Sequence, residues 1–155
     1  MNEYNKDNLE KYKQKIMDGV TDFAYRRKRY AIDYSVVMGL TRSDIDIEKF
    51  IFSKRQTDIV IALEKNLYCV VFDATPLKYA IHAISNLKVR FKKEHSDASI
   101  FISAVNSKDY YNEDEMSDSI FEILDYAIYN DMEGLVTDFH EMGHSSKLNK
   151  NTILN

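Results

Sequence analysis

Two side chains of opposite charge, Arg55 and Asp58, stand three residues apart just before an apolar run. A guanidinium can hold a phosphate or the edge of a base through two hydrogen bonds, and a carboxylate can accept hydrogen bonds from N–H groups. The pair therefore has the chemistry to bind a nucleotide. The same spacing also produces an ordinary surface ion pair, which contributes at most about 1 kcal/mol.

A second motif with possible chemistry is the segment from His140 to His144, which reads HEMGH and matches the HExxH pattern of zinc peptidases. That chemistry needs two histidines on one helical face, a glutamate as general base and a third ligand. No His, Asp or Glu follows His144, and a β-rich run precedes the motif. We therefore expect no metal site here; a zinc hydrolase stays as a third alternative, and adventitious metal binding by the tail is favoured over it.

The third candidate is a run of four basic residues, 26–29, between Tyr25 and Tyr30. Basic residues interleaved with aromatics can bind RNA or a nucleotide. The net charge of the chain is −4, however, and the predicted strands carry no aromatic RNA-recognition pattern, so nucleic acid is not an expected partner. The run is expected instead to pack its helix against acidic partners.

Alternating helical and extended patterns predict the elements that must position these residues. The predicted order after an N-terminal helix is β-α-β-β-α-β-α-β. The strands are expected at 34–41, 59–63, 67–72, 99–105 and 135–139, and the helices at 2–17, 45–54, 76–93 and 117–131.

The two strands that follow Asp58 form a predicted hairpin, and its turn provides a resemblance. RxxD, five residues and a hairpin turn follow one another in the order that the GGDEF domain, the diguanylate cyclase fold, has. In that family the turn reads Gly-Gly-Asp/Glu-Glu-Phe, and an upstream RxxD is the inhibitory site for cyclic di-GMP. Here the signature positions read Glu64-Lys65-Asn66-Leu67-Tyr68.

Two further segments resemble the same family. The segment 18–27, DGVTDFAYRR, is similar to its opening motif D-x-L-T-G-L-x-N-R-R, and 125–134, DYAIYNDMEG, is similar to its closing A-D-x-A-L-Y-x-A-K-x-x-G. The resemblance covers residues 18 to 139 and implies an α/β nucleotide-cyclase-like sheet packed with helices. Residues 1–17 are then an N-terminal helix and 140–155 a polar C-terminal tail.

The resemblance also implies that the domain is not an enzyme. In the family the first strand ends in a metal-binding Asp, but the positions around Gly39, Leu40 and Thr41 carry no carboxylate, and the family's Lys is replaced by Met132. Phosphoryl transfer needs metal ions to offset the charge of the triphosphate. We therefore expect no catalytic residues, no bound metal and no cofactor.

Degenerate GGDEF domains that keep RxxD often serve as cyclic di-GMP receptors. The resemblance therefore implies a receptor or effector in bacterial signalling, with a site made by Arg55, Asp58 and, from the following helix, Arg90. The alternative is a nucleotide-independent scaffold that dimerises or docks a partner through the N-terminal helix. In that helix Leu9, Tyr12 and Ile16 form a thin apolar stripe, better suited to docking on a neighbour than to forming a core.

The bulk composition fits one domain of 155 residues, with 45% hydrophobic and 30% charged residues. No apolar stretch approaches the length of a membrane span, and the N-terminus lacks an apolar signal core. The single cysteine, Cys69, lies in an apolar run and reads as a buried thiol in a reducing compartment. We therefore expect a cytoplasmic soluble protein, or the soluble portion of a larger one, with no membrane insertion.

Overall fold

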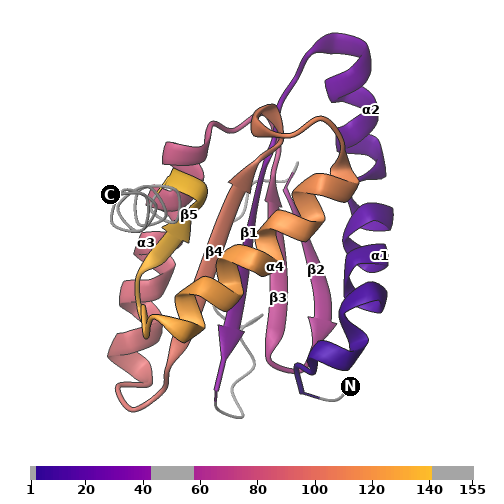
Figure 1. Ribbon diagram of the computed structural model, residues 1–155. Coiled ribbons are helices and arrows are strands. Elements are labelled where there is room, and N and C mark those ends of the chain that lie inside the picture. Colours follow the sequence, from indigo (N-terminus) through magenta and orange to yellow (C-terminus); the bar gives the residue numbers. More distant parts are fainter. Residues whose placement is uncertain (1–2, 43–57, 141–155) are drawn as a thin grey trace, which may run out of the picture.

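The described residues of the computed structural model, 3–42 and 58–140, form a five-stranded sheet with helices on both faces (Figure 1). The strands are β1 (Ser35–Thr41), β2 (Ile59–Glu64), β3 (Leu67–Phe72), β4 (Ile100–Asn106) and β5 (Val136–Asp138). The helices are η1 (Lys6–Asn8), α1 (Leu9–Gly19), α2 (Thr21–Tyr30), α3 (Leu77–Glu94), η3 (Ser107–Asp109) and α4 (Glu113–Tyr129).

The sheet has the order β2-β3-β1-β4-β5, with β1 at its centre. β1 pairs antiparallel with both β3 and β4, β2 and β3 form the predicted hairpin, and β5 lies parallel to β4. The expected α/β architecture is confirmed, as are the N-terminal helix and the hairpin. The predicted helix 45–54, Arg55 and the tail from Glu141 onward lie outside the described residues.

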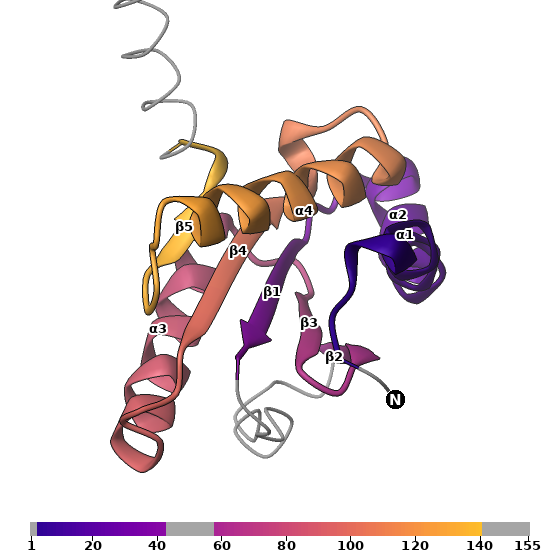
Figure 2. The ribbon, with the colours of Figure 1, turned by 60° about the horizontal axis from the view of Figure 1, so that its bottom comes forward.

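Side chains of β1 alternate between two separate cores, because successive residues of a strand point to opposite faces of the sheet. Val36, Met38 and Leu40 face α1, α2 and α4, whereas Val37 faces α3. Figure 2 shows this layering, with α4 and α3 on opposite sides of the sheet. The helix predicted at 76–93 is α3. Its Ala80, Ile84 and Phe91 lie in the second core, and the exposed His82 lies on its outer side.

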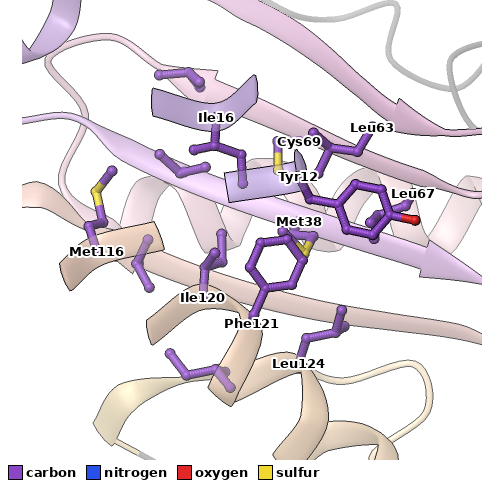
Figure 3. Close-up of a cluster of buried hydrophobic side chains, with 14 of the residues drawn as sticks. Tyr12, Ile16, Met38, Leu63, Leu67, Cys69, Met116, Ile120, Phe121 and Leu124 are labelled. Atoms are coloured by element: carbon purple, nitrogen blue, oxygen red, sulfur yellow. The ribbon is translucent and has the colours of Figure 1, made fainter. Parts of the chain in front are cut away.

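The N-terminal stripe does not behave as predicted. Tyr12 and Ile16 are completely buried against the sheet and α4, and Leu9 packs at the edge of the same core. Figure 3 shows Tyr12 beside Phe121; the centres of these two rings lie 6.2 Å apart. Three apolar positions are enough to bury α1, because the sheet and α4 supply the apolar surfaces that cover them. The helix therefore completes the core of the domain instead of docking on a neighbour.

Two helix starts also differ from the prediction. α4 begins at Glu113, four residues earlier than expected, because the Asn112 side chain caps it by accepting a hydrogen bond from the Glu115 N–H at 2.8 Å. α3 begins at Leu77, one residue later than expected: Pro76 takes the N-cap position without a side-chain bond, and the Thr75 hydroxyl donates to the Asp73 carbonyl at 2.7 Å. Among the described residues, no helix is both long enough and apolar enough to cross a membrane.

Candidate functional site

The β2–β3 turn, which carries the signature positions, is held by buried polar contacts. Glu64 is 5% exposed, and its Oε2 accepts a hydrogen bond of 2.6 Å from the Tyr12 hydroxyl. That hydroxyl in turn accepts from the Asn5 backbone N–H at 3.1 Å. Burial, followed by the bond to Glu64, raises the pKa of Tyr12 above its ordinary value. The first signature side chain therefore ties the turn to α1.

Asn66, at the third signature position, links the turn to two other segments. Its Oδ1 accepts a hydrogen bond from the Tyr4 backbone N–H at 2.8 Å, and its amide nitrogen donates to the Thr41 carbonyl at 2.9 Å. The Thr41 N–H also donates to the Asn66 carbonyl at 3.0 Å. Asn66 thus joins the turn both to the N-terminal segment 3–8, called the strap below, and to the end of β1.

The end of β1 carries no acidic side chain next to this turn. Gly39 and Leu40 pair with Tyr68 and Leu67 of β3, and Thr41 is fully buried. Within the described part of the chain, no three His, Cys, Asp or Glu residues lie close enough together to hold a metal ion. Of the HExxH motif only His140 is described, and it is exposed.

Asp58 lies at the opposite end of the sheet, about 20 Å from the turn along a six-residue strand. It is 2% exposed, and its Oδ1 accepts a hydrogen bond of 2.9 Å from the Asp73 N–H. The Asp73 carboxylate accepts a 2.8 Å bond from the Arg26 guanidinium. Asp58, Asp73 and Arg26 therefore form a connected cluster, called the Asp58 cluster below, where the hairpin ends and α2 passes.

Arg90 is not part of this cluster. It is exposed, and it lies thirteen residues beyond the start of α3, which is about 20 Å along the helix axis. Its neighbour Phe91 lines an apolar pocket with Ile100, which pairs with Thr41 at the turn end of the sheet. The structure therefore does not bring Asp58 and Arg90 together as predicted, because α3 is long enough to place Arg90 near the turn end of the sheet.

The basic run 26–29 is partly neutralised inside the domain. Besides the Arg26–Asp73 pair, Arg27 lies 3.5 Å from Asp33 and 3.3 Å from Glu113, and it donates to the Tyr110 carbonyl. The expectation that this run packs its helix against acidic groups holds for these two arginines, and the groups lie in the same chain. Lys28 and Arg29 are exposed.

Comparison with solved structures identifies the fold of the chain. The structure matches a microbial GGDEF domain studied for its interaction mode with bis-(3,5)-cyclic di-GMP, with a TM-score of 0.65, 8% identity, and coverage of 81% of this chain and 88% of that one. The chain has the fold of a GGDEF domain. It also matches the active GGEEF domain of a diguanylate cyclase from Vibrio cholerae, with a TM-score of 0.63, 14% identity, and coverage of 81% and 95%.

A further GGDEF-fold match is the GGDEF domain of DgcB from Caulobacter crescentus in complex with c-di-GMP, with a TM-score of 0.63, 7% identity, and coverage of 78% and 84%. No family model matches the sequence, and no curated protein matches it either. The likeness to GGDEF domains is therefore one of fold, found by comparison of structures and not of sequences.

Sequence reasoning missed two residues that organise the ends of the sheet. Tyr12 was assigned to a surface stripe, although a tyrosine in an apolar stripe signals a buried ring whose hydroxyl needs a partner. The sequence places Arg26 in the basic run 26–29 and in the opening motif, and neither pattern indicates that it belongs with Asp58. Its link to Asp58 runs through Asp73, and nothing in the spacing of these three residues along the chain indicates that link.

Proposed function

We propose that this GGDEF-fold domain has no cyclase activity and acts as a receptor for cyclic di-GMP. The observation that supports the absence of cyclase activity is that the polar side chains at the signature positions bond to other parts of the domain. Glu64 is bonded to Tyr12, and Asn66 is bonded to Tyr4 and Thr41. Polar groups at a catalytic turn must face substrate and metal, whereas these two hold the domain together.

Inactivity is also supported by the chemistry of the residues around the turn. A GTP-condensing reaction develops charge on phosphoryl oxygens, and metal ions held by carboxylates normally offset that charge. The positions at the end of β1 offer Gly39, Leu40 and Thr41, none of which is an anionic ligand. Glu64 is the acidic side chain at the turn, and it is committed to Tyr12.

The receptor role rests on the Asp58 cluster and on the RxxD to which Asp58 belongs. Cyclic di-GMP is a dianion with two guanines, so its site needs cations that contact phosphate or the guanine edge. Arg26 lies in this cluster with a side chain that is 35% exposed, and Arg55 stands three residues before Asp58 in the sequence. In this proposal the arginines contact the ligand, and the buried Asp58 fixes the end of the hairpin.

Calorimetric titration tests the receptor role. Cyclic di-GMP is expected to bind at micromolar concentration or tighter, with GTP silent as the control. Arg55→Ala is expected to abolish binding while leaving the circular dichroism spectrum unchanged. Arg90→Ala is expected to bind as well as the wild type, since Arg90 lies at the other end of the sheet, and Lys93→Ala, a second exposed cation on α3, provides the matched control.

Two results would reject parts of the proposal. Production of cyclic di-GMP from GTP and Mg²⁺ by the purified protein would show that the domain is a cyclase. If cyclic di-GMP and GTP are both silent in the titration, the receptor role is wrong, and the alternative of a nucleotide-independent scaffold takes its place. If Arg90→Ala weakens binding and Arg55→Ala does not, the ligand occupies another site.

A further inference from the structure

A cleft with a volume of about 610 Å³ lies between α2 and the start of α4. Tyr25 and Lys28 line it from α2, and Tyr111 and Glu113 line it from the loop and first turn of α4. Figures 1 and 2 both show the start of α4 beside α2, at the end of the molecule away from the β2–β3 turn. The cleft is therefore separate from the signature positions.

The aromatic side chains of this cleft are unusually open to solvent. Tyr111 is 93% exposed, Tyr25 is 60% exposed, and Tyr30 packs edge-on against Tyr25 with its own ring 61% exposed. Tyrosine is enriched in the buried centres of protein–protein interfaces, where its ring gives apolar contact and its hydroxyl finds a partner. Tyrosines gathered at one cleft therefore indicate a surface that a macromolecule covers.

Charges on the two sides of the cleft have opposite sign. On the α2 side, the exposed Lys28 and Arg29 make no ion pair with any other described residue, whereas Arg27 is already neutralised by Asp33 and Glu113. On the α4 side, Asp114 and Glu115 are exposed and acidic. The cleft thus has a basic side on α2 and an acidic side on α4, and each side contributes a tyrosine.

We propose that the α2–α4 face, made of Tyr25, Lys28, Arg29, Tyr111, Asp114 and Glu115, binds a second copy of this chain. A two-fold axis through the cleft turns one copy by half a rotation, so the basic side of each copy meets the acidic side of the other. The exposed tyrosines then come together at the centre. A face that carries both positive and negative charges around a central pair of aromatic rings is complementary to a second copy of itself. An acidic or a basic partner protein would require a face of one charge sign only.

Charge reversal on each side tests the dimer, with association measured by analytical ultracentrifugation at low salt. The wild type is expected to dimerise at micromolar concentration. Lys28→Glu with Arg29→Glu makes both sides acidic, and Asp114→Lys with Glu115→Lys makes both sides basic. Each double variant alone is expected to lose at least about tenfold in dimer affinity, because like charges now face one another. Their equimolar mixture is expected to restore the dimer.

Two further variants separate the interface from stability. The charge reversals oppose the dipoles of α2 and α4, so circular dichroism must confirm that the variants fold. Tyr111→Ser changes a side chain that is almost fully exposed in the monomer, and it is expected to weaken the dimer without affecting folding. Lys93→Glu on α3 makes the same type of charge change away from the face and is expected to leave the dimer intact.

The proposal is wrong if the wild type stays monomeric throughout the micromolar range. It is also wrong if the folded double variants dimerise as well as the wild type, or if their mixture fails to associate while each is folded. No nucleotide enters this experiment, so its result is independent of cyclic di-GMP binding.

Discussion

The Tyr12 hydroxyl donates a 2.6 Å hydrogen bond to Glu64, which joins the first α-helix to the turn of the β2–β3 hairpin. Both groups are almost completely buried, so neither can exchange this bond for one with water. The strap adds the bond from Tyr4 to Asn66 on the other side of the same turn. The turn is therefore a structural junction of the domain.

Tyr12→Phe is expected to destabilise the domain by about 2 kcal/mol, because the buried Glu64 carboxylate loses a hydrogen bond to a charged acceptor. Urea unfolding measures this change in the free energy of unfolding. Tyr4→Phe is the matched control: the Tyr4 ring lies 5.8 Å from that of Tyr12, but its buried hydroxyl has no hydrogen-bond partner among the described residues. Removing that hydroxyl is expected to leave stability unchanged or higher. Equal losses in the two variants would contradict the assigned bond.

Stability is expected to fall as the pH rises above about 10. An unfolded tyrosine has a pKa near 10, whereas burial raises the pKa of Tyr4 to about 12, and those of Tyr12, Tyr34 and Tyr110 also rise, mainly through burial. The folded state thus holds these protons more tightly, so its advantage is complete below pH 10 and is lost as the pH rises through the folded values. Urea midpoints measured between pH 8 and pH 12 check this. A midpoint that stays constant over that range would show that the tyrosines are not buried as described.

Gly19→Ala tests the close approach of α1 to β2. A Cβ added to Gly19 would lie 2.5 Å from Cδ1 of Ile61, which is closer than real contacts allow. The isoleucine must move, and we expect a loss of about 1–2 kcal/mol in the free energy of unfolding. In an Ile61→Ala background the same substitution is expected to be neutral or stabilising, since alanine also favours a helix over glycine by about 1 kcal/mol. Additive effects of the two substitutions would rule out the contact.

Cys69 is expected to resist thiol reagents in the folded protein. It is completely buried in β3, and burial raises the pKa of its thiol above the ordinary range, so little reactive thiolate is present at neutral pH. Reaction with a chromogenic disulfide should proceed only at the rate of unfolding and become fast in urea. Rapid modification of the native protein would place Cys69 at the surface.

The sheet and its largest helix could be predicted because their patterns are local. The runs 59–63 and 67–72 are apolar and separated by a polar turn, and the apolar spacing from Leu77 onward repeats with the helical period. The strand 67–72 is buried on both faces and the helix on one, and in both cases the run or spacing of apolar residues in the sequence carries the signal.

The contacts at the two ends of the sheet could not be predicted in the same way. Tyr12 is buried only because Phe121 and Leu63, from elements far along the chain, close over it. Arg90 was grouped with Asp58 by its place on the next helix, but the rise of that helix sets the distance, and it carries Arg90 away. Contacts between segments that lie far apart in the sequence follow from the three-dimensional structure and cannot be predicted from spacing along the chain.

The packing of α1 against α4 also has a consequence during synthesis of the chain. Tyr12 and Ile16 are translated before every strand of the sheet, but their partners on α4, Ile120 and Phe121, are translated only after β1 to β4. Until then the apolar side of α1 has only part of its final contacts. The nascent domain therefore cannot complete its larger core before α4 emerges, and this step is expected to be when a co-translational chaperone is released.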